Sequence, residues 1–453
     1  MRKSALLAMT LVAMLSMSAC SSGNNGGNNG EAAEGGGNGA NAGTNANAGA
    51  NSGKTDGDAA ATNEGAANSE VKGEVTFLTN RTDMIDKEYN DYEKKFEAKY
   101  PGVDLKFETI ANDYNSQLKV RIASGKYPDV VLIADAIPNS DFPKYFEPLD
   151  DIQFSDELNF KDMKSFEGKS YGISSGGNTF GIVYNKQAFA KAGITDVPKT
   201  LDELYADSQK LKDAGIVPFA SNFKDKWPLG AWSNDVVSII SGKPDVGNLR
   251  AETDTPYAQD SAYFQSWSII REMYSKGFLE KDVNSTNWEQ SKKDVATGKF
   301  AMYGLGNWVI NQVIGAGAKS EDVGFFPFPA DNSGTPKAPL GSDFFYAVNK
   351  GGNTAAAKAF IQWMIEESGY EDFAGFIPTL KNKQSGLAQL AEFKGYNPTF
   401  VEAVAGSDKA TQIQNEAKID QEALVQEFVL SKDPIKVIDK ANEQWAKARK
   451  KVQ

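Results

Sequence analysis

The fold is decided by three short stretches of the chain: EVTFLT at residues 74–79, VDLKFET at 103–109 and VVLIA at 130–134. The second stretch alternates apolar and polar side chains, as a half-buried strand does. The third is continuously apolar and is flanked by Pro128 and Pro138, which is typical of a strand buried on both faces of a parallel sheet. We therefore predict a β-strand at each of the three positions.

The two intervals between these strands have helical spacing. Apolar side chains recur there every three or four residues, as on one face of a helix. They are Ile85, Tyr89, Tyr92 and Phe96 in the first interval and Tyr114, Leu118 and Ile122 in the second. Pro101-Gly102 and Gly125 end the two helices. The order is βαβαβ, so we predict an α/β fold that begins with a parallel sheet.

Later segments carry the same kinds of signal. We predict a strand at 181–184, a short helix at 187–192, and a helix that starts at Thr200, where Glu203 completes a capping box. Helical spacing returns at Tyr263, Trp267, Ile270 and Tyr274, and after Asp433-Pro434 at Ile435, Ile438, Ala441 and Trp445. Strands and helices thus alternate along the whole chain.

Polar side chains follow each of the first three predicted strands. Asn80 and Arg81 follow the first, Asn112 and Asp113 the second, and Asp135 the third. Open sheets of this type bind ligands beyond the carboxyl ends of their strands. We therefore predict a binding site at this edge, although each side chain could instead cap the helix that follows it.

The first twenty residues have the layout of a lipoprotein leader. Cations at positions 2–3 precede an apolar stretch at 5–17, and small residues then lead to Cys20, the only cysteine. The stretch is too short for a membrane-spanning helix, which needs roughly 20 residues. We predict that residues 1–19 are removed and that Cys20 is acylated, which would anchor the protein to the outer face of the cell membrane. The alternative is an ordinary secretory signal in which the cysteine falls by chance.

Residues 20–70 are almost wholly glycine, asparagine, alanine and serine, and they contain no aromatic residue. Such a segment has too little apolar surface to fold, so we predict a disordered tether with a reach of about 40 Å. The folded body is then expected at 71–453, which is long enough for two domains.

Composition excludes several functions. The formal net charge of −12 argues against nucleic acid as a partner. The basic run at 447–451 is instead interpreted as the end of a helix, where cations complement the helix dipole. The chain has no histidine, so a Ser–His relay and histidine-based zinc sites are excluded. The GISSG fragment at 172–176 is accordingly interpreted as a chance match to the G-x-S-x-G motif of hydrolases.

Four segments together resemble the family 1 extracellular solute-binding proteins, the carbohydrate-binding lipoproteins of ATP-driven importers. They are 96–133, with KFEAKYPGVDLKFETI (from residue 95) followed by ASGKYPDVVLI; 168–200, with GKSYGI, VYNKQAFAKAGI and VPKT; 296–308, with ATGKFAMYGLGNW; and 323–329. The resemblance runs from near Val71 to near Gly369. The chain departs from the family at Ser174, where proline is usual.

The resemblance implies a periplasmic-binding-protein-like fold, with two α/β lobes joined by a hinge and a sugar held in the cleft between them. One lobe would comprise mainly 71–180 plus a later returning segment. The other would comprise mainly 181–330 plus the C-terminal helices. The implied function is capture of a sugar or oligosaccharide and delivery to the permease of an ABC transporter, without catalysis, cofactor or metal, and we expect a monomer.

Two functions of other classes stay open on the residues alone. A glycosidase needs only two carboxylates across a sugar bond, and the chain has 60 acidic residues. A surface-anchored enzyme of that kind would release new reducing ends from oligosaccharides. A passive adhesin would not close on a soluble sugar.

The seven tryptophans can be sorted by their surroundings. Trp267, Trp363 and Trp445 lie at inward helical positions and are predicted to be core residues. The candidates for stacking on a sugar lie among Gly, Pro, Asn, Asp or Ser; they are Trp227, Trp232, Trp288 and Trp308. By similarity to the family, Trp308 in the GLGNW segment, with Asn307 beside it, stacks on sugar at a helix start; it could otherwise fill the seam between the lobes.

Two further polar residues complete the predicted site. Asn178 lies in a glycine-rich crossing region, and Asp343 stands among aromatic residues. Because burying an unpaired carboxylate is unfavourable, Asp343 needs a partner. Sugar hydroxyls could supply one, and so could a backbone amide.

Overall fold

The computed structural model describes residues 71–110 and 113–452. The predicted leader, the acylated Cys20, the tether and Asn112 lie outside the described residues.

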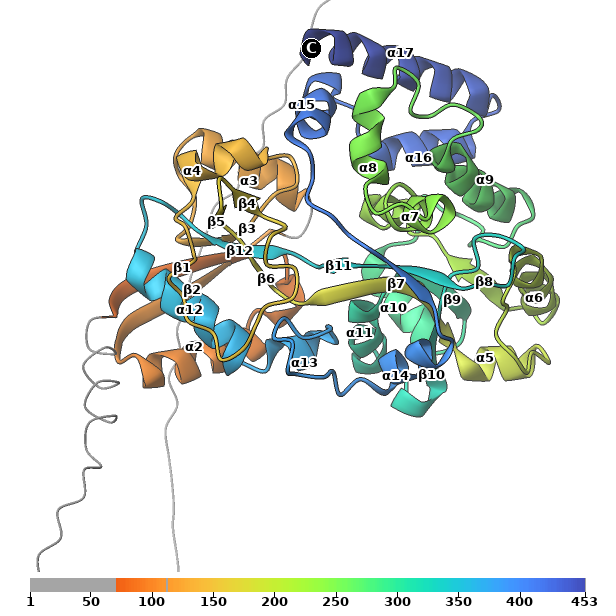
Figure 1. The fold of residues 1–453 in the computed structure, drawn as a ribbon. Coiled ribbons are helices and arrows are strands. Elements are labelled where there is room, and N and C mark those ends of the chain that lie inside the picture. The colour runs from red at the N-terminus through yellow and green to blue at the C-terminus, as the bar shows by residue number, and fades with distance from the viewer. Residues whose placement is uncertain (1–70, 111–112, 453) are drawn as a thin grey trace, which may run out of the picture. The chain divides into compact units, whose positions relative to one another are not determined.

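The first sheet confirms the predicted βαβαβ segment. Its order is β2-β1-β3-β12-β6, and β1 pairs in parallel with both β2 and β3. Its strands are β1 (Lys72–Thr79), β2 (Gly102–Thr109), β3 (Val130–Leu132), β6 (Ile173–Ser174) and β12 (Phe345–Val348). The late strand β12 runs antiparallel between β3 and β6. We call this sheet and the helices around it the first lobe (Figure 1).

The helices of the first lobe follow the predicted spacing with one difference. They are η1 (Thr82–Met84), α2 (Glu88–Lys99), α3 (Tyr114–Ala123), η2 (Asn139–Asp141), α4 (Phe142–Tyr145), α12 (Thr354–Glu366) and α13 (Tyr370–Ala374). The helix expected near Ile85 begins only at Glu88. Asp86 has a left-handed backbone, with φ of 59°, which a right-handed helix cannot include.

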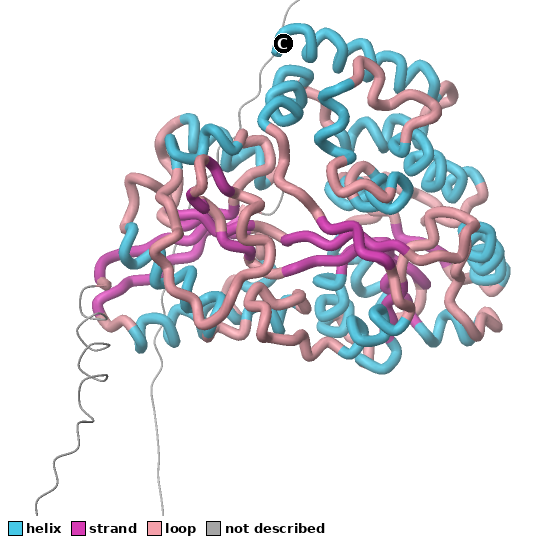
Figure 2. The backbone as a smooth tube through the Cα atoms, viewed as in Figure 1, coloured by secondary structure: helices cyan, strands magenta, loops and turns pink. Residues whose placement is uncertain are grey.

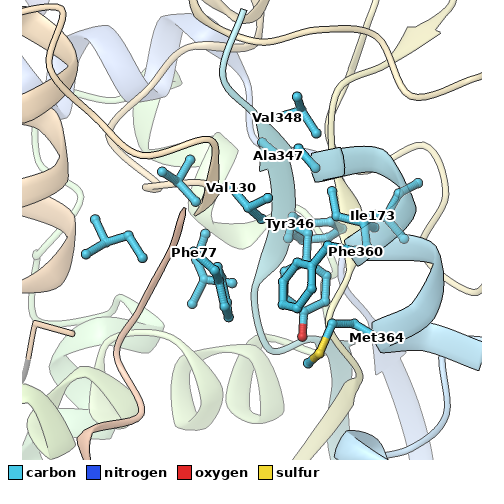
Figure 3. Packing of buried hydrophobic residues seen from close by; sticks show 14 of the residues in the cluster. Phe77, Val130, Ile173, Tyr346, Ala347, Val348, Phe360 and Met364 are labelled. Atoms are coloured by element: carbon cyan, nitrogen blue, oxygen red, sulfur yellow. The ribbon is translucent and has the colours of Figure 1, made fainter. Parts of the chain in front are cut away.

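A single apolar core fills the first lobe. Phe77 of β1, Val130 of β3 and Tyr346 of β12 pack with Phe360 and Met364 of α12, and each is at most 2% exposed. Figure 3 shows these side chains together with Ile173, Ala347 and Val348. Residues 75–173 and 345–380 therefore form this core together, so the lobe cannot be cut from one continuous segment.

The second sheet is built around β7. Its order is β13-β11-β7-β9-β8, with β10 also paired to β7. Its strands are β7 (Gly177–Asn185), β8 (Val217–Ala220), β9 (Phe300–Gly306), β10 (Val323–Phe326), β11 (Lys337–Ser342) and β13 (Thr399–Glu402). A separate pair, β4 (Ser165–Phe166) with β5 (Lys169–Ser170), completes the described strands.

Helices surround the second sheet and form the second lobe with it (Figure 2). They are α5 (Lys186–Lys191), α6 (Leu201–Asp213), η3 (Trp227–Trp232), α7 (Asp235–Ser241), α8 (Val246–Leu249), η4 (Arg250–Glu252), α9 (Ala262–Ser275), α10 (Trp288–Ala296), η5 (Asn307–Val309), α11 (Ile310–Gly315), η6 (Ser320–Asp322), α14 (Ala388–Gly395), α15 (Asp408–Ala417), α16 (Gln421–Leu430) and α17 (Pro434–Val452). The predictions for Trp267, Trp363 and Trp445 are confirmed, because these side chains are 0–3% exposed.

Two short connections join the sheets side by side. Residues 175–176 lead from β6 to β7, and residues 343–344 lead from β11 to β12 (Figure 1). They bond to each other, since the Asp343 amide donates to the Gly176 carbonyl at 2.8 Å. Gly176 has a φ of 141°, and a Cβ there would meet the Phe376 ring at 2.3 Å, so only glycine fits. We call these two connections, together with the flanking residues Ser174, Asn178 and Ser342, the hinge.

Candidate ligand-binding site

The hinge presents hydrogen-bond acceptors. The Asn178 amide nitrogen donates to the Asp343 carboxylate at 2.8 Å, whereas the Asn178 side-chain oxygen is buried without a protein partner. Burial raises the pKa of Asp343 to about 6, although the bond from Asn178 and the charge of Arg81 act to lower it. The partner of Asp343 is thus a side-chain amide of the crossing strand. The Asn178 oxygen is an acceptor that no protein group satisfies, which is the kind of group that a hydrogen-donating ligand would pair with.

Arg81 follows β1 and is held by Asp83. Its Nε and one terminal nitrogen donate to the two Asp83 oxygens, each at 2.8 Å, in a bidentate pair. The guanidinium lies over the rings of Tyr370 and Phe373, at 5.9 and 5.7 Å. Burial would raise the pKa of Asp83, but the Arg81 pair and the charge of Lys292 lower it. Lys292 belongs to the second lobe, so the two lobes approach each other here.

The second lobe contributes three tryptophans in mutual contact. Trp227 and Trp288 are the first residues of η3 and α10, and Trp308 lies in η5 directly after β9. Ring centroids are 5.2 Å apart for Trp227 and Trp288, 5.7 Å for Trp227 and Trp308, and 5.6 Å for Trp288 and Trp308. All three rings are half-buried. We call these three side chains the aromatic wall.

A hollow of about 530 Å³ brings hinge and wall together. This volume is in the range of small-molecule sites, about 300–1,000 Å³. Its lining includes Asn178, Trp227, Trp308, Gly341, Ser342 and Val401. Residues far apart in the sequence therefore meet at one place, and three of the predicted site residues line it: Asn178, Trp227 and Trp308. Trp288 is not in the lining but contacts both tryptophans that are, and Asp343 follows the lining residue Ser342.

Two carboxylates of the hollow were not predicted. Asp235 begins α7, and burial raises its pKa to about 7. Glu422 lies in the first turn of α16, and burial together with the charges of Asp420 and Asp113 raises its pKa to about 7. Acidic residues are common at helix starts because they complement the dipole, so nothing in the sequence separated these two from ordinary helix starts.

Two predicted ligand-binding residues are instead buried inside the second lobe. Trp232, at the end of η3, is 3% exposed and packs against Phe219 and Phe328. Asn307 is 0% exposed; its oxygen accepts from the Thr179 amide at 2.7 Å and its nitrogen donates to the Gly375 carbonyl at 2.7 Å. Trp232 is a core residue, and Asn307 joins β9 to β7 and to the returning segment.

The remaining predicted residues show no shared contact with this hollow. Asp135 is exposed and forms an ion pair with Lys164 at 3.6 Å. Asn80 is half-buried directly before Arg81. Ser174 of the GISSG fragment is 2% exposed and is hydrogen-bonded to Ser342 Oγ at 2.8 Å, so it is part of the hinge. In contrast, Asp83, Tyr370 and Lys292 were missed, because only the fold brings them near Arg81.

Comparison with known proteins identifies the family. The profile of the bacterial extracellular solute-binding proteins matches residues 79–371. This chain belongs to that family. The family 1 resemblance of the sequence is thereby confirmed, as is the α/β two-lobed fold.

Sequence relatives include other binding proteins. An uncharacterised extracellular-binding protein of an ABC transporter from Pyrococcus horikoshii is 27% identical, over 64% of this chain and 67% of its own length. The diacetylchitobiose-binding protein DasA from Streptomyces coelicolor is 26% identical, over 66% of this chain and 71% of its own length.

Solved structures agree with these matches. The binding protein of an ABC transporter from Bifidobacterium animalis subsp. lactis, in complex with mannobiose, superposes with a TM-score of 0.75 at 26% identity, covering 85% of this chain and 96% of that chain. The raffinose complex of RafE has a TM-score of 0.69 at 19% identity, covering 83% of this chain and 100% of that one. The relatives named here are binding proteins, not enzymes.

Residues 71–110 and 113–452 contain neither a cluster of metal ligands nor a membrane-spanning helix. No group of three or more Cys, Asp or Glu side chains there is arranged to hold a metal ion. No helix of this part combines the length and the apolar character of a membrane span.

Proposed function

We propose that this protein captures a neutral oligosaccharide outside the cell and delivers it to an ABC transporter permease. The observation that carries the proposal is the hollow in which a wall of tryptophans meets a hinge of hydrogen-bond acceptors. Sugars have apolar CH faces that stack on aromatic rings and hydroxyls that donate hydrogen bonds. The two surfaces match these two features.

The charges around the hollow favour an uncharged ligand. Arg81 is paired with Asp83, and Lys292 donates to Glu289 at 2.8 Å while lying 4.9 Å from the Trp288 ring. These two cations thus each have a carboxylate partner, and Arg250, which lines the hollow, already donates to the Gly247 carbonyl and to Gln414 Oε1. Asp235 and Glu422 add carboxylates to the lining. A uronic acid would bring a further negative charge next to these groups, so we expect neutral sugars to bind more tightly.

Closure of the lobes gives the mechanism. A ligand that touches both the aromatic wall and the hinge favours the closed arrangement by as much as its contacts differ between the two states. The relatives named above support an oligosaccharide ligand, since those with a named sugar bind mannobiose, diacetylchitobiose or raffinose.

The finer parts of the proposal concern location and partners. Acylation at Cys20 would hold the protein on the outer face of the cell membrane, with residues 20–70 as a tether to the body. The body would act as a monomer beside its permease. Mass spectrometry of the mature N-terminus tests the anchor, because cleavage elsewhere or an unmodified Cys20 would contradict it.

A panel of sugars tests the function itself. The body, residues 71–453 with the natural tether, is heated with mannobiose, mannotriose, raffinose, diacetylchitobiose and digalacturonic acid in turn. A ligand at 100 times its Kd stabilises the folded state by about 2.7 kcal/mol, which raises the melting temperature. We expect at least one neutral sugar to do so and the digalacturonic acid to have no effect. A shift with none of the neutral sugars would contradict the proposal.

A further inference from the structure

We infer that Glu280 is a positioning residue for sugar binding: its buried carboxylate anchors the loop 221–227, which places Trp227 and Trp288 in the aromatic wall. The inference rests on the proposed function of the wall and assigns a role to a residue that does not touch the hollow.

Glu280 holds the start of the loop through three donors. It is 6% exposed, and it accepts from the Ser221 amide at 3.0 Å, from Ser221 Oγ at 2.8 Å and from the Asn222 amide at 3.1 Å. Ser221 and Asn222 are 4% and 0% exposed, so water does not compete for these donors. A carboxylate suits this position because its two oxygens can accept several converging N–H and O–H groups.

The loop needs an anchor because its backbone is unfavourable. Asn222 and Lys226 have positive φ values of 55° and 61°, in a region that non-glycine residues rarely occupy. Such conformations cost of order 1–3 kcal/mol each and persist only when their surroundings fix them. The bonds to Glu280 fix the first of these residues, and a bond of 2.7 Å from the Trp227 amide to the Asp225 carbonyl fixes the turn at Lys226, directly before η3.

The same loop reaches the second tryptophan. The Asp225 carboxylate accepts from the Trp288 amide, and the Asn222 side-chain oxygen accepts from Ser291 Oγ of α10. Both contacts fix the start of the helix that carries Trp288. Glu280 therefore acts on Trp227 along the loop and on Trp288 through Asp225 and Asn222.

Tyr303 packs against the wall from the protein interior. Its ring lies 5.7 Å from the Trp288 ring, and it is 1% exposed. Burial and the charges of Glu280 and Asp225 raise the pKa of its hydroxyl well above the usual value. The ring contact and the burial of Tyr303 place it behind Trp288.

Substitution of Glu280 by glutamine tests the inference. The amide keeps the shape but offers the converging donors one oxygen fewer. We expect the affinity for the sugar of the panel that most stabilises the wild type to fall about tenfold, which corresponds to about 1.4 kcal/mol. The near-ultraviolet circular dichroism of the ligand-free protein should also change, because it reports the mutual packing of the tryptophans. Unchanged affinity together with an unchanged spectrum would overturn the inference.

A double-mutant cycle separates positioning from a general loss of stability. In a background that lacks both rings that Glu280 places, Trp227→Ala with Trp288→Ala, Glu280→Gln should lower affinity by less than about twofold further. A full tenfold loss in both backgrounds would overturn the inference. Ser221→Ala is a milder second variant that removes one bond, and it should change affinity in the same direction by about threefold.

The matched control is Asp207→Asn, a buried carboxylate of α6 that is 7% exposed and bonds to Lys210. It should leave affinity and the near-ultraviolet spectrum unchanged. If no sugar binds the wild type, the proposed function fails, yet the ligand-free spectrum of Glu280→Gln still decides whether Glu280 positions the wall.

Discussion

The second lobe offers the hollow two indole rings, Trp227 and Trp308, which are supported by a third, Trp288, whereas the hinge offers polar groups that are already paired with one another. The aromatic wall has its shape before any ligand arrives, because each ring supports the other two. The polar side keeps spare acceptors on Asp343 and on Asn178. The comparison teaches that the aromatic wall can supply most of the binding energy, whereas the acceptors of the hinge can determine how the sugar is oriented.

The largest expected effect is on the wall. Trp308→Ala should weaken sugar binding about a hundredfold, or about 2.7 kcal/mol, because it removes a ring from the stack. Thermal stability should change little, since the ring is half-buried. Titration calorimetry and a melting curve measure the two quantities. A large loss of stability with unchanged affinity would instead identify Trp308 as a filler of the lobe.

Two further variants sharpen this result. Gly306→Ala should lower affinity by a smaller factor, because a Cβ there would meet the Trp308 ring at 2.6 Å and displace it. Trp363→Ala is the control in the core of the first lobe, where the side chain is 3% exposed. It should cost about 3–5 kcal/mol of stability, and any sugar binding that survives should keep its affinity.

The next effect is on the hinge. Asp343→Asn should lower sugar affinity about tenfold at neutral pH, because a neutral amide oxygen is a weaker acceptor than a carboxylate and the other half of the group becomes a donor. The wild-type affinity should also fall as the pH drops through about 6, where Asp343 becomes protonated. This step should be absent from Asp343→Asn. Asp235 and Glu422 titrate near pH 7 in both proteins, so the difference between the two pH profiles isolates Asp343.

The stability of the ligand-free protein should move the opposite way. The pKa of Asp343 is about 6 in the folded state and about 3.9 when unfolded, so the folded state binds the proton more tightly. Wild-type stability should therefore fall relative to Asp343→Asn as the pH rises from about 4 to about 6. Denaturant unfolding at several pH values measures this. If the stability of the wild type instead fell relative to Asp343→Asn as the pH was lowered, the raised pKa of Asp343 would be contradicted.

The smallest effect concerns contacts between the lobes away from the hollow. The Asp408 carboxylate of α15 accepts from the amides of Asn139 and Ser140 at 2.7 and 3.2 Å, and Asn415 donates to the Ala136 carbonyl at 2.8 Å. Asp408→Ala should weaken the closed arrangement and lower sugar affinity about threefold.

In a stopped-flow experiment, Asp408→Ala should release the sugar faster than the wild type does, because its closed arrangement is weaker. The control is Asp433→Ala, at the start of α17, where the carboxylate pairs with Lys436. It should leave release unchanged. Equal release rates for wild type and Asp408→Ala would show that these bonds do not contribute to closure.

The sequence predicted the parts of the fold that depend on local spacing. The βαβαβ segment, the helix that carries Trp267 and the start at Thr200 are all present, although Glu203 returns its bond to the Lys199 amide instead of that of Thr200. The pairing of strands that are far apart in the sequence could not be predicted. β12 joins the first sheet some 200 residues after β3, and periodicity alone gives no sign of its partner.

The site was predicted in part, for the same physical reason. Trp227 and Trp232 stand in the same turn-rich segment, yet one lines the hollow and the other is buried, since composition does not tell which way a side chain points. Asp83, Tyr370 and Asp235 gain their significance only from neighbours that the fold supplies. The acceptors of the hinge were easier to predict from the sequence. Asp343 is a single acidic residue among aromatic ones, and a carboxylate in such surroundings needs a partner.

The central claim is that one sugar contacts both sides of the hollow at once. Hydrogen–deuterium exchange of the protein with and without the sugar that most stabilises it tests this directly. We predict slower exchange both at 341–344, which includes the lining residues Gly341 and Ser342, and at 226–232, which carries Trp227. Protection confined to one of these two segments, or absent from both at saturation, would contradict the account.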